Sequence, residues 1–209
     1  AGVPLDTAPI NAELRRRQGG YGRGGRQRIE TDEVEILSGT WHHCSLGSPI
    51  ALQVVNKDYK LERLEDLDRP RPGHGDLSGA LKYLGPIRGV LERASARETA
   101  VRVAAGALAK QLLSAFGIEA LGYVVEVGGQ TIEVTPGTMS EQRQRRDRSS
   151  IYSLNPELDG TIEMLIDDAG KAGDTLGGIV EVRVEGLPFG LGTHTQWDLK
   201  LDGRLAQAV

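Results

Sequence analysis

The sequence is poor in cysteine, in aromatic residues and in long apolar runs, and these shortages exclude several classes of protein. A single cysteine among 209 residues, Cys44, excludes an intramolecular disulfide framework and a cysteine-rich zinc site, which fits a reducing compartment. No apolar run approaches the roughly 20 residues that cross a bilayer, and the first residues show no signal-peptide pattern. We therefore expect a soluble, cytoplasmic protein with no membrane partner.

Glycine and arginine, in contrast, are abundant. The 28 glycines make up an eighth of the chain, against a usual share of about 7%. Lysine and arginine number 25 against 29 acidic residues, a net charge of −4, and 19 of the 25 are arginine. Because the planar guanidinium binds carboxylates and phosphates through paired hydrogen bonds, this bias favours an anionic ligand.

The arginines gather near the N-terminus, in a stretch without acidic residues that contains Arg15, Arg16, Arg17, Arg23, Arg26 and Arg28. A local reversal of charge in an acidic protein favours one bound anion over a uniformly basic nucleic-acid surface. A solvated basic face explains the charge alone equally well. Both interpretations stay open at this point.

The glycines at positions 20–25 match the spacing G-x-G-x-x-G of dinucleotide-binding proteins. That motif needs a strand before it and a helix after it, and here the expected order is reversed, so we reject this interpretation. An RGG-type nucleic-acid segment would be longer and disordered, and we expect no nucleic-acid partner. A glycine loop carrying arginines, able to close over an anion, is what the pattern supports.

Four histidines, His42, His43, His74 and His194, do not supply the spacing of a metal site, and we expect no metal. His74 differs in its setting, because Pro70 and Pro72 constrain the loop that presents it between Arg71 and Asp76. A histidine beside a bound phosphate can donate a proton, although a lone histidine is more often a structural residue.

Hydrophobic periodicity predicts helices over residues 9–18, 95–116 and 158–170, the second opened by a capping box from Ser95 to Glu98. It predicts strands over residues 31–37, 50–55, 119–127, 131–134 and 179–185, and a surface loop or linker over 141–150. Ser95 caps its helix in one interpretation and helps Arg93 and Arg97 to bind phosphate in another. One α/β or α+β domain follows.

Several segments, in order along the whole chain, resemble the chorismate synthase family: GYGRGGRQRIE (20–30), EILSG (35–39), LGSPIAL (46–52), RPRPGHGDLSGALKY (69–83), VLERASARETAVRVAAGALAK (90–110), GDTLGG (173–178), GLPFGLG (186–192) and WDLKLDGRLAQA (197–208). The resemblance implies an α+β fold, a β-α-β sandwich of antiparallel sheets with outer helices, assembled as a homotetramer. It implies a lyase of the shikimate pathway of aromatic amino acid biosynthesis. Such an enzyme removes phosphate and a proton from 5-enolpyruvylshikimate 3-phosphate in an anti-1,4-elimination to give chorismate, and it needs reduced FMN (FMNH2) without net redox change.

The resemblance also implies roles for individual residues. Four arginines match substrate-binding positions, Arg17, Arg23, Arg71 and Arg97, and the first two match a pair that binds the phosphate of substrate or of NADP. His74 matches a catalytic histidine that acts as an acid near the substrate phosphate. The triplet Arg93, Ala94 and Ser95 matches an FMN-binding position.

Family members are longer than this chain, so we expect residues 1–209 to be a single domain that is incomplete at both ends. The family's second catalytic histidine, in a G-E-S-H-G motif, and its K-P-T-S-S flavin loop lie outside this stretch, and the 209 residues alone should therefore be inactive. Two alternatives remain open: a bifunctional form that reduces flavin with NADPH, and a degenerate homologue without catalysis.

Overall fold

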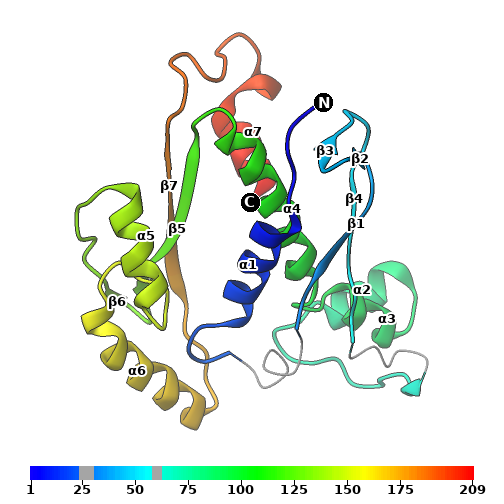
Figure 1. Cartoon of the computed structure of the whole chain (residues 1–209). Helices are drawn as coiled ribbons and strands as arrows, with labels where there is room; N and C mark the ends of the chain where they lie inside the picture. The colour runs from blue at the N-terminus through cyan, green and yellow to red at the C-terminus, as the bar shows by residue number, and fades with distance from the viewer. Residues whose placement is uncertain (24–30, 58–62) are drawn as a thin grey trace. The chain divides into compact units, whose positions relative to one another are not determined.

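The computed structural model describes residues 1–23, 31–57 and 63–209 (Figure 1). These residues form two compact units, Ala1–Gln111 and Leu112–Val209. The predicted glycine-arginine loop is described only as far as Arg23, and Arg26 and Arg28 lie outside the described residues.

The first unit begins with helix α1, Thr7–Gln18, which is capped by Asp6 through a hydrogen bond from the Ala8 amide to Oδ1 at 2.9 Å. Strands β1, Val34–Ser38, and β4, Ala51–Val54, pair antiparallel, and between them lies the small hairpin of β2, Thr40–Trp41, and β3, Cys44–Ser45. The predicted helix and both predicted strands are confirmed here, with slightly different ends.

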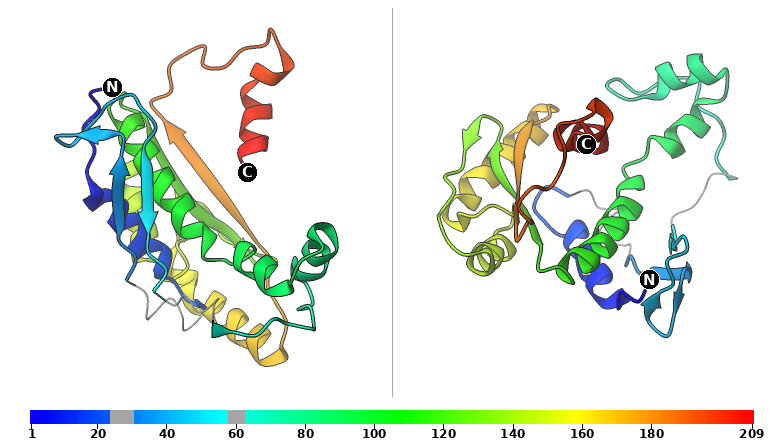
Figure 2. Two further views of the ribbon diagram at one scale, coloured as in Figure 1. Left: turned by 90° about the vertical axis from the view of Figure 1, so that its right-hand side faces the viewer. Right: turned by 90° about the horizontal axis from the view of Figure 1, so that it is seen from above.

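Helix α4, Glu98–Ser114, supplies the other half of this unit's core and runs beside α1 (Figure 2). Its small buried residues Ala100 and Ala104 pack against Ile10 and Leu14 of α1 and against Val34 of β1. Alanines allow backbones to approach closely, which explains why a helix so rich in alanine lies against the sheet. Val103 and Leu108 of α4 pack half-buried against the same core, and Leu112 near the end of the helix is 44% exposed.

The start of α4 differs from the prediction, because the capping box is not formed. The Ser95 hydroxyl accepts from the Arg97 amide at 3.3 Å, and the helix begins only at Glu98. The Glu98 carboxylate accepts from Arg102 Nε at 2.8 Å instead of from the Ser95 backbone. The Glu98 side chain, which a capping box requires, is instead paired with Arg102 one turn further along the helix.

A helical hairpin, which the periodicity did not predict, joins β4 to α4. It consists of α2, Asp76–Tyr83, and α3, Ile87–Arg93. Leu84 ends α2 in the left-handed conformation with φ of 50°, and Pro86 begins α3. The helices touch at Gly79, where a Cβ atom would lie only 2.4 Å from Val90 Cγ1, so this crossing requires glycine.

The second unit is built on β5, Glu119–Val127, which pairs antiparallel with β6, Gln130–Thr131, on one side and with β7, Gly178–Glu185, on the other. Two small cores form around the sheet, one on Leu121, Tyr123 and Leu154 and one on Ile132 and Ile162. Helix α6, Asp159–Ala172, contributes Ile162 and ends at Gly173 in the left-handed conformation. The remaining elements are the short 3-10 helices η3, Pro156–Leu158, and η4, Trp197–Leu199, and the helix α7, Leu201–Ala208.

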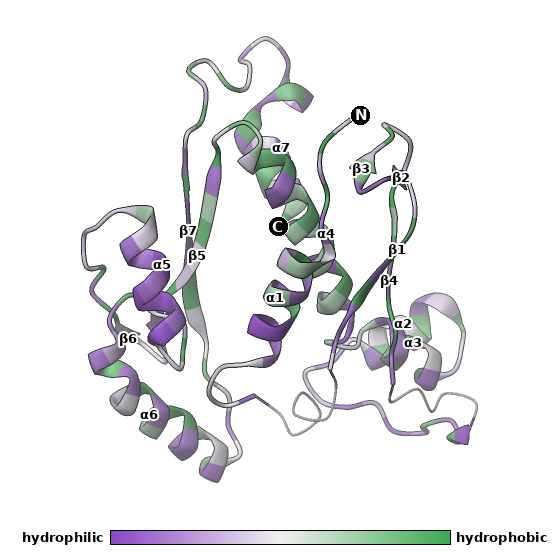
Figure 3. Cartoon of the chain, viewed as in Figure 1, coloured by the Kyte–Doolittle hydropathy of each residue, from purple (hydrophilic) through white to green (hydrophobic). Residues whose placement is uncertain are grey.

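The predicted loop over residues 141–150 is wrong, because this stretch is helix α5, Met139–Arg148. Thr138 and Glu141 form a reciprocal capping box at its start. The helix is hydrophilic along most of its length (Figure 3), and its inner face is polar rather than apolar. Buried Gln142, for example, accepts from Arg183 Nη1 at 3.0 Å. Hydrogen bonds hold this helix in place of an apolar stripe, and without such a stripe hydrophobic periodicity did not predict a helix here.

Strand β6 is also shorter than the predicted strand over residues 131–134, because pairing ends at Thr131 apart from one hydrogen bond from the Ile132 amide to the Val125 carbonyl at 2.8 Å. The predicted strands over 119–127 and 179–185 and the helix over 158–170 are confirmed. Helices combined with antiparallel sheets confirm the α+β class. None of the helices in the described part of the chain is both long enough and apolar enough to span a membrane.

We predict that the second unit loses stability at high pH because of Tyr123. The side chain is 3% exposed, and its hydroxyl donates to the Glu181 carboxylate on the neighbouring strand β7. Burial, and then the bond to Glu181, raise the pKa of Tyr123 to about 12. Since the folded state favours the neutral phenol, stability is complete below about pH 10 and falls by on the order of 1–2 kcal/mol as the pH rises toward 12.

Urea unfolding followed across this pH range tests the prediction. Tyr123→Phe should remove this alkaline loss, and Tyr83→Phe, a change at an exposed tyrosine of α2, should leave it as in the wild type. An equal alkaline loss in Tyr123→Phe would contradict the assignment.

Candidate functional site

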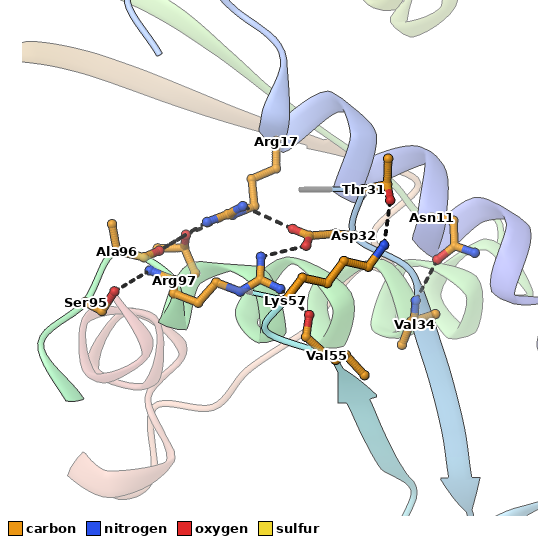
Figure 4. Close-up of polar contacts among 11 residues, drawn as sticks. Asn11, Arg17, Thr31, Asp32, Val34, Val55, Lys57, Ser95, Ala96 and Arg97 are labelled. Carbon is orange, nitrogen blue, oxygen red and sulfur yellow. Dashed lines mark hydrogen bonds and ion pairs between the residues drawn. The ribbon is translucent and has the colours of Figure 1, made fainter. Parts of the chain in front are cut away.

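Asp32, just before β1, is the centre of a buried charged cluster (Figure 4). It is 3% exposed, and its two carboxylate oxygens face two different arginines. Arg97 Nη1 lies 2.6 Å from Oδ1, and Arg17 Nη1 lies 3.4 Å from Oδ2. The structure therefore brings together two arginines that the resemblance assigns to substrate binding, with a carboxylate that the sequence interpretation did not assign.

The other donors of these guanidinium groups connect separate elements of the first unit. Arg17 Nε donates to Thr99 Oγ1 at 2.9 Å, and Arg17 Nη2 donates to the Ala96 carbonyl at 3.2 Å. Arg97 Nη2 donates to the Val55 carbonyl at 2.8 Å, just after β4. The cluster thus links the end of α1, the end of β4 and the start of α4.

Arg23 has a different environment from Arg17. Arg23 is exposed, and its Nε donates to the carbonyl of Gly19, directly after α1, at 3.1 Å. Lys57 is also exposed and donates to Thr31 Oγ1 at 2.8 Å, beside Asp32 in the sequence. Arg23 is therefore open to solvent, and Arg17 is largely buried.

His74 lies in a second cluster, with Arg71 and Asp76, in the loop before α2. Asp76 is fully buried and receives a forked ion pair from Arg71, with Nε 2.8 Å from Oδ2 and Nη2 3.0 Å from Oδ1. The Arg71 amide adds a hydrogen bond to Oδ2 at 3.1 Å. The hydrogen bonds from Arg71 lower the pKa of Asp76 to about 2, so the carboxylate is ionised at neutral pH. Arg71 Nη2 also lies 3.2 Å from His74 Nδ1.

A cavity of about 650 Å³ lies against the α2–α3 hairpin. Gly75, which separates His74 from Asp76, is among the residues that line it, and so are Lys82, Tyr83, Val90, Arg93 and Ala94. The Arg93 side chain is 80% exposed and lies 3.8 Å from the Glu98 carboxylate. Two members of the predicted FMN-binding triplet thus line a cavity, and the third, Ser95, binds the Arg97 amide.

The two acidic partners, Asp32 and Asp76, were not recognised as site residues from the sequence. A usable signal did exist for Asp76, because it stands two residues after His74 in the segment 69–83, in which Arg71 and His74 were assigned. Across residues 1–23, 31–57 and 63–209, no group of three or more His, Cys, Asp or Glu side chains is arranged to hold a metal ion. His42 and His43 form the turn between β2 and β3, with φ of 46° and 59°.

Comparison with known proteins covers the whole chain. The sequence model of the family described as chorismate synthase matches residues 1–209. A chorismate synthase of Enterococcus faecalis is 47% identical and one of Listeria welshimeri is 48% identical, each over 225 aligned positions that include 100% of this chain. Each match covers 58% of the relative, so the chain spans little more than half the length of these curated relatives.

A solved structure, titled as the crystal structure of chorismate synthase, matches 99% of this chain and 58% of its own, with a TM-score of 0.80 and 39% sequence identity. The arrangement of helices and antiparallel sheets described above is therefore shared with this solved chorismate synthase. The family match, the relatives and the shared fold agree, and the chain belongs to the chorismate synthase family.

Proposed function

We propose that the full-length protein that contains this chain is a chorismate synthase and converts 5-enolpyruvylshikimate 3-phosphate into chorismate and phosphate. The observation that carries the proposal is the grouping of the assigned residues: Arg17 with Arg97, and Arg71 with His74. A substrate with one phosphate and two carboxylates needs several guanidinium groups, and these clusters supply them in the first unit.

The assigned residues have distinct roles in this proposal. Arg71, Arg97, Arg17 and Arg23 bind and orient the anionic groups of the substrate. In a 1,4-elimination, a base takes a ring proton and the electron pair of that C–H bond forms a new double bond. The double bond already in the ring shifts by one position toward the carbon that bears the phosphate, and the carbon–oxygen bond breaks with its electron pair on the departing phosphate. His74 donates a proton to the departing phosphate, which lowers the cost of the negative charge that develops there.

The cavity at the α2–α3 hairpin suits a flavin. Tyr83 and Val90 offer apolar surface to a planar ring, and the exposed Arg93 and Lys82 offer positive charge to a phosphate, so the lining fits FMN. We propose that Arg93, Ala94 and Ser95 take part in holding it. When bound, reduced FMN would lend electron density to the substrate as phosphate leaves. NADPH as the source of reductant, and assembly into a homotetramer, also belong to the proposal.

An anaerobic assay of the full-length protein tests the proposed function. We expect chorismate to form from 5-enolpyruvylshikimate 3-phosphate when photoreduced FMN is supplied. Chorismate formation with NADPH and oxidised FMN in air would show that the protein also reduces flavin. Absence of product under both conditions would contradict the proposal and favour a homologue without catalysis.

A further inference from the structure

The contact between Arg71 and His74 restricts the position of the proton on the histidine ring. An arginine guanidinium has five N–H donors and no acceptor. The distance of 3.2 Å between Arg71 Nη2 and His74 Nδ1 is therefore a hydrogen bond only when Nδ1 carries a lone pair. In that state the neutral ring has its proton on Nε2.

The guanidinium that makes this contact is itself held in one orientation. Asp76 receives Nε, Nη2 and the backbone amide of Arg71 at 2.8, 3.0 and 3.1 Å. Its carboxylate is fully buried at the first residue of α2, so a regular element fixes its place. Pro70 and Pro72 restrict the backbone on both sides of Arg71. The His74 amide, in addition, donates to the Arg71 carbonyl at 3.4 Å.

We propose that Asp76 is a positioning residue for His74: through Arg71 it holds the neutral ring with the proton on Nε2, and its Oδ1 is the acceptor for Nδ1 when the ring gains a second proton. The importance of this arrangement for catalysis rests on the proposed function, in which His74 donates a proton to the departing phosphate. The arrangement itself is a property of the protein without ligand.

The distances from His74 Nδ1 to Arg71 and to Asp76 support one partner for the neutral ring and another for the protonated ring. Asp76 Oδ1 lies 3.9 Å from Nδ1, outside hydrogen-bond distance, so in the neutral ring Nδ1 is bound by Arg71. A proton taken from solvent onto Nδ1 removes the lone pair, breaks the hydrogen bond from Arg71 and leaves two cations in contact. A small rotation toward Oδ1 then replaces this contact by a hydrogen bond to a carboxylate. The imidazolium can give its Nε2 proton to a phosphate and keep the proton on Nδ1.

Asp76 is suited to this second task because it is ionised over the pH range in which histidines titrate. Among the described residues, Arg71 and Asp76 are the charged groups that make hydrogen bonds or ion pairs with the His74 ring. An asparagine at position 76 would retain an acceptor but would lose the charge and half of the fork with Arg71.

Nitrogen-15 NMR of the imidazole rings, recorded without substrate or flavin on the full-length protein, tests the inference. At a pH where the rings are neutral, His74 should show a fully protonated Nε2 and an unprotonated Nδ1. Exposed His194 should show the mixture of tautomers found in water, as an internal reference. In Asp76→Asn and in Arg71→Lys, the His74 signals should move toward that mixture.

The controls separate positioning from a purely structural role. Asp66→Asn removes another carboxylate of the same region, one that accepts from the Arg88 amide at the start of α3 at 2.8 Å, and it should leave the His74 signals unchanged. Arg71→Lys changes a half-exposed side chain, so the test survives if Asp76→Asn fails to fold. A mixture of tautomers at His74 in the wild type, or wild-type signals in Arg71→Lys, would overturn the inference. Neither result depends on whether the protein makes chorismate.

Discussion

Replacing Asp32 with alanine should destabilise the first unit by about 3–5 kcal/mol, because it removes a buried carboxylate that pairs with two largely buried guanidinium groups. The loss should be concentrated where the cluster connects elements, at the end of α1, the end of β4 and the start of α4. Urea unfolding measures its size, and amide hydrogen exchange shows its location.

Glu98→Gln provides the control for Asp32→Ala. It removes the ion pair with Arg102 within α4, which is open to solvent on the Arg102 side, and should cost much less stability than Asp32→Ala. Inorganic phosphate should stabilise Asp32→Ala more than the wild type, because an anion can take the place of the carboxylate beside the two guanidinium groups. A loss in Asp32→Ala no larger than that of the control would show that the buried cluster is not a structural centre.

His74→Gln should lower kcat of the full-length protein by about 100- to 10,000-fold, the range that a general acid contributes, with a much smaller change in KM. Glutamine retains a hydrogen-bond donor near the site but cannot deliver a proton to the departing phosphate. Anaerobic steady-state kinetics with photoreduced FMN measures both constants.

The matched control is His194→Gln, which changes an exposed histidine of the second unit and should leave turnover unchanged. Turnover near the wild-type value in His74→Gln would remove the acid from the mechanism. The departing phosphate would then leave without a proton from His74.

Helices and strands with an apolar period could be predicted from the sequence, and those held by polar contacts could not. Apolar residues alternate along strand β5 and recur at helical spacing along α6, and both elements were predicted. Helix α5 has buried Gln142 and Arg146 where such a pattern needs apolar side chains. The signal for α5 was its cap, since Thr138 and Glu141 stand at the capping-box spacing. The same spacing at Ser95 and Glu98 formed no box, because Arg102 competes for the carboxylate.

The site shows a similar division. Resemblance to a family assigned Arg17, Arg97, Arg71 and His74, but it did not identify the carboxylates that hold them. Asp32 lies 65 residues from Arg97 in sequence, and only the fold brings the two side chains together. Pairing of this kind depends on tertiary structure, so composition and spacing could not have predicted it.

The core of the first unit also has a consequence for biosynthesis. Ile10 and Leu14 lie near the N-terminus, and their partners Ala100 and Ala104 come much later in the chain. At the usual speed of translation, on the order of 10 s separates the synthesis of α1 from that of α4. The apolar side of α1 therefore leaves the ribosome well before its partner helix exists. During that interval its apolar side chains stay exposed to solvent, whereas Leu121, Tyr123, Met139 and Leu154 of the second unit are made within a short stretch and can pack as they emerge.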